Sequence, residues 1–252
     1  QKILKKCLIN SEILSWKGQK PNKNVQSLAR KKRLELLSSK CDQFKIGNIL
    51  LGHHQDDLIE NFFIRILRGS GLKGLVSLDK KSVIEKKNLI RPLLFEKKEN
   101  LIFISKHVFN FYVQDPSNKD EKYLRIRIRK LIEVLKKNGL NKKQFIKTIK
   151  NLKSSNSVVD YYVSENLSYN TFFYSKKNIT ILNREFFQKP YEITFRSFSY
   201  LIKLIGKKHY FVRGKKLDNV ITNISKNNLK KLTLGGCIIE KVNQTIIVSK
   251  ER

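Results

Sequence analysis

The stretch Asn48–Leu75, NILLGHHQDDLIENFFIRILRGSGLKGL, decides the fold of this chain. Residues 49–51 have the length and composition of a strand that is buried on both faces. Gly52 turns the chain into the polar segment 53–57, and the apolar residues after it recur at helical spacing, as a helix packed on a core requires. A buried strand running into an amphipathic helix, with further helices and strands on either side, predicts an α/β fold with a doubly wound parallel sheet. Ligands of such sheets bind beyond the carboxyl ends of the strands, so the polar segment marks a candidate site.

Three carboxylates follow the turn, and each has two interpretations. Asp56 or Asp57 could simply cap the helix, because a carboxylate at a helix start satisfies free N–H groups. Glu60 lies one turn beyond Asp56, so both side chains share one edge of the helix. Three clustered carboxylates repel one another unless a cation or an amine lies between them, and the cluster therefore favours a functional site.

Residues 53–75 resemble the HHxDDxxET…RxxRGSGxxGL signature of the bacterial tRNA(Ile)-lysidine synthetases, which belong to the PP-loop (N-type ATP pyrophosphatase) superfamily. Asn61 stands where that family usually has Thr. Further segments agree in the same order along the chain, namely Arg91–Leu94 (RPLL), Asp115–Asn118 (DPSN) and the arginines Arg125, Arg127 and Arg129. The resemblance covers about residues 1–135.

The resemblance implies an activity and its substrates. The family adenylates the wobble cytidine of tRNA(Ile) with a CAU anticodon, using ATP and Mg²⁺, and the side-chain amine of free L-lysine then displaces AMP. A carboxylate cluster suits this chemistry, because phosphates need a metal ion and the lysine ammonium must be held and deprotonated. We therefore expect Asp56 and Glu60 to be catalytic with Asp57 in support, Asp56 to bind the metal, and His53 and Arg68 to contact the nucleotide. The resemblance leaves open whether the protein is a homodimer.

One departure from the family pattern concerns the phosphate loop. The family opens with a strand followed by SGGxDS, and this sequence contains no such loop, no Met, and Gln1 as its first residue. We expect the chain to be a fragment that lacks an N-terminal segment carrying the loop; the alternative is a degenerate paralogue that has lost it. Such a fragment should bind tRNA but not ATP, and should be inactive alone.

The charge balance points to a polyanionic partner. The 252 residues include 53 Lys and Arg against 21 Asp and Glu, a formal net charge of +32, which favours nucleic acid. No apolar run approaches the length of a membrane span and no signal peptide is visible, so a membrane partner is not expected. The three cysteines are isolated, which fits a reducing cytoplasm rather than a disulfide framework.

A basic run follows the resembling segments. Residues 122–153 carry twelve basic side chains and the single acid Glu133. We expect this run to follow a phosphate backbone, with tRNA contacts from Arg125, Arg127, Arg129 and Lys130. Asn138-Gly139 should end a helix, so the sequence predicts a catalytic domain at 1–138 and a smaller, basic α+β tRNA-binding domain at 139–252.

Within these domains several local elements are expected. Glu12–Trp16 is interpreted as a short strand and Lys80–Lys87 as a charged surface turn. In the second domain we expect a strand at Ile179–Leu182, helices near 190–205 and 216–224, and a C-terminal hairpin that turns at 242–244. Most of the aromatic residues between Tyr161 and Tyr200 should belong to the core.

Two other functions remain open on the residues alone. A divalent-metal phosphohydrolase or nuclease could use His53, His54, Asp56 and Asp57 as ligands, but it would need further ligands from elsewhere. A non-catalytic RNA-binding fragment would explain the charge without any chemistry.

Overall fold

The computed structural model describes residues 1–18, 25–84, 87–113, 120–175, 179–208 and 211–251. The chain forms two compact units, Gln1–Lys150 and Asn151–Arg252, which are described separately below. The boundary predicted after residue 138 lies at the turn between helices α6 (Leu124–Lys137) and α7 (Lys142–Asn170), whereas the units divide within α7. Where the functional domains divide stays a prediction.

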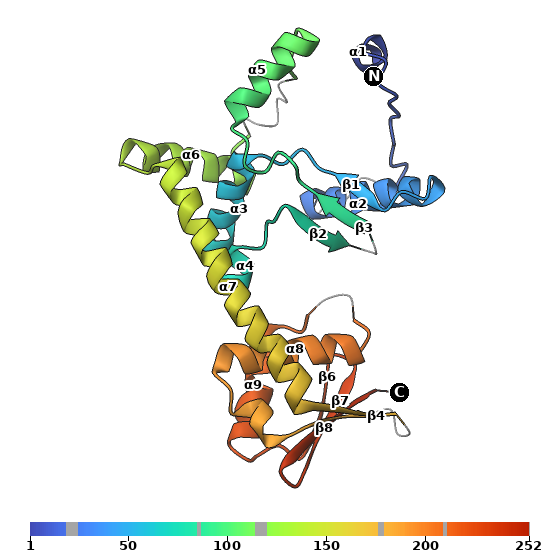
Figure 1. Ribbon diagram of the computed structural model, residues 1–252, viewed down its shortest axis with the longest axis vertical. Coiled ribbons are helices and arrows are strands. Elements are labelled where there is room, and N and C mark those ends of the chain that lie inside the picture. Colours follow the sequence, from blue (N-terminus) through green and yellow to red (C-terminus); the bar gives the residue numbers. More distant parts are fainter. Residues whose placement is uncertain (19–24, 85–86, 114–119, 176–178, 209–210, 252) are drawn as a thin grey trace. The chain divides into compact units, whose positions relative to one another are not determined.

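The first unit contains a three-stranded sheet in the order β1-β3-β2. Strand β1 (Asn48–Leu50) runs parallel to β3 (Lys87–Ile90), and β2 (Lys81–Ile84) pairs with β3 in the antiparallel direction. The parallel pair, connected through helices, confirms the α/β class, and the antiparallel edge strand makes the sheet mixed (Figure 1). As expected for an open α/β sheet, the polar segment 53–57 follows the carboxyl end of β1.

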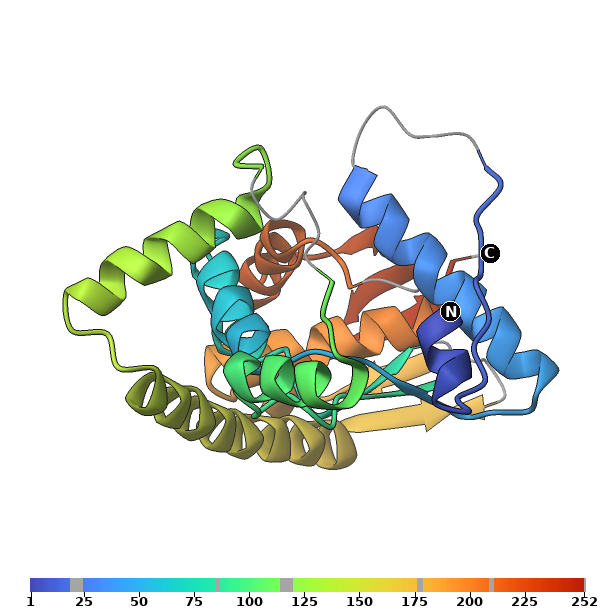
Figure 2. The same ribbon diagram turned by 90° about the horizontal axis from the view of Figure 1, so that it is seen from above.

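The other elements of this unit are helices. They are α1 (Lys2–Lys6), α2 (Val25–Gln43), α3 (Gln55–Leu67), α4 (Leu72–Leu75), α5 (Lys98–Phe109), α6 and the start of α7. Helices α3 and α6 lie side by side, as two perpendicular views show (Figures 1 and 2). Their contact is an apolar cluster in which Ile59 of α3 meets Ile128 and Ile132 of α6 and Ile146 of α7. Burial of this cluster fixes which face of α3 remains available to the site.

Two local predictions in this unit are wrong. Residues 12–16, expected as a strand, form no regular structure, because the described sheet consists of β1, β3 and β2 and offers them no ladder partner. The expected surface turn at 80–87 instead contains β2, which pairs with β3 from Lys81 opposite Ile90. Its charged residues are tolerated because β2 is an edge strand with a mostly exposed surface.

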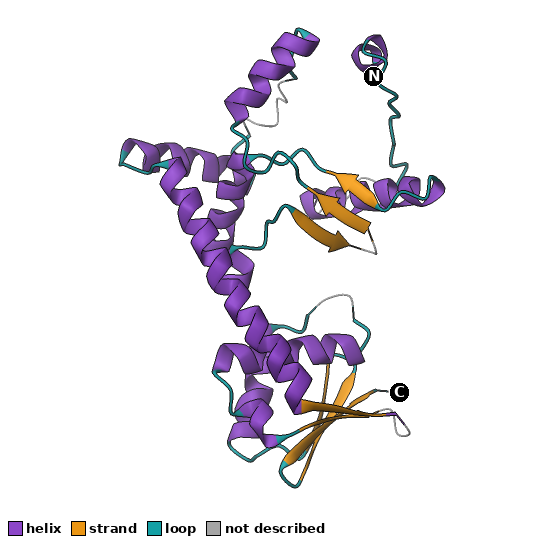
Figure 3. Cartoon of the chain, in the orientation of Figure 1, coloured by secondary structure: helices purple, strands orange, loops and turns teal. Residues whose placement is uncertain are grey.

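The second unit is an antiparallel five-stranded sheet in the order β4-β5-β8-β7-β6. Its strands are β4 (Thr171–Tyr174), β5 (Ile179–Leu182), β6 (Lys231–Leu234), β7 (Cys237–Val242) and β8 (Thr245–Lys250). Helices α8 (Tyr191–Ile205) and α9 (Gly214–Ser225) pack on one face of it (Figure 3). The α+β architecture, the β5 strand, both helices and the hairpin at 242–244 are as predicted.

The aromatic residues of the second unit do not form its core as expected. Phe186 and Phe198 are fully buried, but most of the predicted set lies at the surface. The core is built mainly from aliphatic residues on β5, β7, β8, α8 and α9, which leaves little volume for large rings. The exposed rings are Tyr161, Tyr162, Tyr169, Phe172, Phe173, Tyr174, Tyr191 and Tyr200.

Two further observations concern the whole described chain. None of its described helices combines the length and the apolar character needed to cross a bilayer. The three cysteines carry free thiols, with Cys7 exposed, Cys41 half-buried and Cys237 buried.

Candidate active site

The polar segment after β1 forms the N-terminal cap of α3. The Nδ1 atom of His54 accepts a hydrogen bond from the backbone N–H of Asp56 at 3.2 Å. In return, the Oδ2 atom of Asp57 accepts one from the backbone N–H of His54 at 3.0 Å, which completes a capping box. The capping interpretation therefore holds for Asp57. Asp56 is not used in this way and is available to the site.

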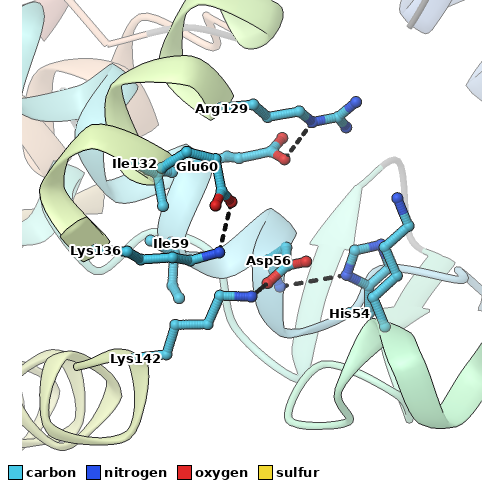
Figure 4. A pocket seen from close by; sticks show the side chains of 10 residues that line it. His54, Asp56, Ile59, Glu60, Arg129, Ile132, Lys136 and Lys142 are labelled. Atoms are coloured by element: carbon cyan, nitrogen blue, oxygen red, sulfur yellow. Dashed lines mark hydrogen bonds and ion pairs between the residues drawn. The ribbon is translucent and has the colours of Figure 1, made fainter. Parts of the chain in front are cut away.

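A cavity of about 160 Å³ opens beside this cap, and Asp56 and Glu60 both line it (Figure 4). The other lining residues come from the cap and first turns of α3, from α5, from α6 and from the start of α7, so the whole cavity belongs to the first unit. Lys142 Nζ donates a hydrogen bond to Asp56 Oδ1 at 2.6 Å. Burial disfavours the charged form of Lys142, but Asp56 outweighs that effect and raises the pKa of the Lys142 ammonium above its ordinary value. The full lining is His54, Asp56, Ile59, Glu60, Lys98, Arg129, Ile132, Glu133, Lys136 and Lys142.

Glu60 is the most buried acid of the cavity, with 2% of its surface exposed. Arg129 Nε donates to Glu60 Oε1 at 2.6 Å. The second oxygen, Oε2, accepts no hydrogen bond from the described residues, and Arg125 Nε stays 3.8 Å from it. Burial raises the pKa of Glu60 above its usual range, although the bond from Arg129 opposes the shift. An unsatisfied buried carboxylate oxygen facing a cavity suits a ligand that brings a hydrogen-bond donor.

The structure places a basic group against each member of the acidic cluster. Lys142 meets Asp56, Arg129 meets Glu60, and the guanidinium of Arg125 lies 3.9 Å from Asp57 Oδ1. The repulsion expected for three neighbouring carboxylates is thus relieved by side chains of α6 and α7.

His53 sits beside this cluster, between β1 and α3. Its Nδ1 atom is buried and has no hydrogen-bond partner among the described residues. Burial lowers the pKa of His53, because desolvation disfavours the imidazolium, and the neighbouring Arg91 and Arg125 lower it further. His53 is therefore a neutral ring with an unused nitrogen, as a contact to a polar ligand requires. Its assignment to the nucleotide stays a prediction.

The arginines predicted to hold tRNA divide between two faces of α6. Arg125 and Arg129 point to the acidic cluster, whereas Arg127 and Lys130 are exposed and both contact Glu121. Arg68 caps the far end of α3, about 18 Å along the helix from Asp56. The structure thus brings Arg129 to the cavity and Arg125 to the acidic cluster beside it, but Arg68 to neither, and the roles of all these residues stay predictions. The DPSN segment at 115–118 lies outside the described residues.

Sequence reasoning missed several cavity residues. Lys142 was included only in the basic run, and Lys98 and Lys136 were not singled out as site residues. Lys142 lies 86 residues beyond its partner Asp56, so no local spacing connects the two. One signal was present in the sequence: a cluster of acids in a strongly basic chain needs neighbouring cations, and α6 and α7 supply most of them.

The fit of Mg²⁺ to these residues is limited. Among the described residues, no three His, Cys, Asp or Glu side chains come together as a metal site. Asp56 and Glu60 are also already paired with Lys142 and Arg129. By themselves these residues do not assemble a Mg²⁺ site, nor the ligand set that a phosphohydrolase would need. Asp56 as a metal ligand stays a prediction.

The α/β unit, with a polar cavity at the carboxyl end of its parallel strand, has the arrangement of a nucleotide-dependent enzyme. Residues 1–135 match the family model described as the PP-loop domain, so the chain belongs to the PP-loop family.

Similar proteins cover the second unit as well. The chain is 33% identical over 246 residues to the tRNA(Ile)-lysidine synthase of Wolbachia sp. subsp. Brugia malayi, which covers 96% of this chain and 56% of that protein. The enzyme of the same name from Wolbachia pipientis wMel is 32% identical over 243 residues, with 96% and 56% covered. That of Orientia tsutsugamushi is 33% identical over 252 residues, with 94% and 55% covered. The chain thus spans about half the length of the curated relatives that it matches.

Proposed function

We propose that this chain is part of an enzyme that joins free L-lysine to the wobble cytidine of tRNA(Ile) with a CAU anticodon, at the expense of ATP. The modified base changes the codon that the tRNA reads and the amino acid that it carries, from methionine to isoleucine. Membership of the PP-loop family supports the use of ATP, and the name shared by the similar proteins supports the tRNA substrate.

The observation that carries the proposal is the pair of acidic groups in one cavity. Asp56 and Glu60 stand one turn apart on α3, and Glu60 presents an unsatisfied buried oxygen. Lysine brings two ammonium groups, which are strong donors to carboxylates. A small, polar cavity with one buried and one half-buried acid therefore suits free lysine better than a nucleobase or a sugar.

Each residue has a role in the proposed reaction. Glu60 holds the lysine ammonium and accepts its proton, because its raised pKa makes it a stronger base than an ordinary carboxylate. Asp56 orients the same substrate, and Asp57 fixes the start of α3 so that both acids face the cavity. His53 contacts the nucleotide through its unused nitrogen. The amine then attacks the ring carbon whose carbonyl oxygen has been adenylated. A new C–N bond forms as the C–O bond breaks, and AMP leaves with the former carbonyl oxygen.

The tRNA is held by charge. The basic run at 122–153 and the overall charge of +32 attract the phosphate backbone, and Arg127 and Lys130 present the exposed part of that run on α6. Backbone contacts position a nucleic acid without reading its sequence, so the unpaired wobble base must be recognised near the cavity.

The test uses the product of the complete gene with ATP, L-lysine and unmodified tRNA(Ile) transcript. Nucleoside mass spectrometry after digestion should detect lysidine, only when all three substrates are present. A transcript of tRNA(Met) with the same anticodon is the matched control and should remain unmodified. Hydrolysis of the RNA without lysine incorporation would instead support a nuclease.

A further inference from the structure

The cavity contains an ion pair that the proposed reaction does not use. Lys142 is the first residue of α7, and its ammonium lies 2.6 Å from Asp56 at the cavity wall (Figure 4). The two side chains are 26% and 24% exposed, so water and small solutes reach both. The pair is only partly desolvated, so its opening costs less than that of a fully buried ion pair.

The other basic residues of the cavity differ from Lys142 in their partners or in their position. Arg129 is bonded to buried Glu60, and Lys136 is bonded to Glu133. Lys98 lines the wall from α5 and forms no ion pair with a carboxylate in the described part of the chain. The Lys136–Glu133 pair is also accessible, but both of its residues belong to α6, whereas the Lys142–Asp56 pair includes the acid that stands one turn before Glu60 on α3.

We propose that Lys142 is the residue that selects for the α-carboxylate of the amino-acid substrate, which inserts into the Lys142–Asp56 ion pair. An amino acid carries an ammonium and a carboxylate on one carbon atom, so it complements two adjacent side chains of opposite charge. Its α-ammonium replaces Lys142 at Asp56, and its carboxylate takes the freed ammonium of Lys142. No charge is left without a partner in either state.

The side chain of the bound amino acid then points along α3. Glu60 lies one turn, about 5.4 Å, beyond Asp56. Four methylene groups can span one turn, which brings the second ammonium of lysine to Glu60. This inference rests on the proposed function, because it assumes that free lysine enters this cavity. It adds a residue, Lys142, that recognises the carboxylate by which lysine differs from a simple diamine.

The experiment measures binding, so it does not depend on turnover. Equilibrium dialysis of the full chain with labelled L-lysine is compared with displacement by lysine methyl ester, which keeps both ammonium groups but lacks the anionic carboxylate. The wild-type chain should bind lysine with a dissociation constant about tenfold lower than that of the ester, because one hydrogen bond to a charged group changes affinity by about this factor. Lys142→Ala should remove this preference, and Lys142→Arg should keep most of it.

Two control variants make the result specific. Lys32→Ala removes a lysine from a comparable ion pair, 2.7 Å from Glu35 on α2 and outside the cavity, and should keep the wild-type preference. Lys98→Ala tests the other lysine of the wall. If Lys98→Ala abolishes the preference while Lys142→Ala keeps it, the assignment to Lys142 is wrong.

The remaining outcomes are also decisive. Tighter lysine binding by Lys142→Ala would show that Lys142 only competes for Asp56, and an unchanged preference would show that the pair is structural; either result overturns the inference and leaves the proposed function intact. Failure of the wild-type chain to bind lysine, with the ester equally inert, would count against both. If Lys142→Ala does not fold, Lys142→Gln replaces it, because glutamine keeps the length of the stem without the charge.

Discussion

Removal of Arg129 should destabilise the first unit in a pH-dependent way. Arg129 Nε donates a hydrogen bond to Glu60 Oε1 at 2.6 Å, and Glu60 is almost completely buried. Breaking a buried ion pair by removing one partner costs about 3–5 kcal/mol. The Arg129 side chain is 37% exposed and Arg125 remains nearby, so we expect about 2 kcal/mol for Arg129→Met. For a chain of this size that corresponds to about 4–8 °C in melting temperature.

The pH dependence follows from the direction of the Glu60 shift. Burial already raises the pKa of Glu60 above the ordinary 4.5, and loss of Arg129 raises it further. The folded state then holds a proton that the unfolded state releases, so stability is greatest below about pH 4.5 and falls as the pH rises through the folded pKa. The cost of Arg129→Met should therefore be present at pH 7 and shrink at pH 4.

Thermal unfolding followed by far-UV circular dichroism measures this prediction. The double variant Glu60→Gln with Arg129→Met should recover stability at pH 7, because no buried charge is left without a partner, and Arg127→Met is the exposed control on the same helix. A cost below about 0.5 kcal/mol at pH 7, typical of a surface pair, would refute the idea that Glu60 is a buried, ionised group held by Arg129.

Three other predictions concern the cap, the RNA and the salt dependence. Asp57→Ala should cost about 1 kcal/mol through loss of the capping box, while Asp57→Asn should cost much less; a similar loss for both in thermal melts would mean that the charge, not the cap, stabilises α3. Arg127→Ala combined with Lys130→Ala should weaken binding to all tRNAs alike and reduce the slope of log affinity against log salt by up to about two. Filter binding measures both effects. An unchanged slope with lost discrimination between isoleucine and methionine tRNAs would mean that these side chains read bases. Arg125→Ala, which removes a guanidinium next to Asp57, should change that slope by less than about one, and a larger change would place Arg125 on the RNA.

The sequence predicted the elements whose signals are local. A strand near 49–51, the helix after it and the helices near 190–205 and 216–224 follow from hydrophobic periodicity, which depends on neighbours a few residues apart. The expected burial of that strand on both faces is wrong, because β1 ends at Leu50 and Leu50 is 68% exposed. The sequence does not predict β2, because an exposed edge strand shows no buried alternation. It wrongly predicts a strand at 12–16, because a strand also needs a partner that the sequence does not reveal.

The site was predictable to the same extent. Asp56 and Glu60 stand on one helix edge, so their spacing alone placed them together. Their partners Arg129 and Lys142 come from α6 and α7, and only the packing of Ile59 against Ile128, Ile132 and Ile146 brings those helices to the acids. The sequence indicated that cations were needed there but not which ones.

The most direct test of the proposed function is the rate of lysine transfer by the Asp56→Asn variant of the complete gene product. Asparagine keeps the size of the side chain and removes the charge that faces Lys142 and the cavity. With labelled lysine, ATP and tRNA(Ile), we expect lysine incorporation to fall by at least about a hundredfold. Binding of the same tRNA, measured in parallel by filter retention, should remain close to wild type. Near-normal incorporation would contradict the assignment of this cavity to the reaction.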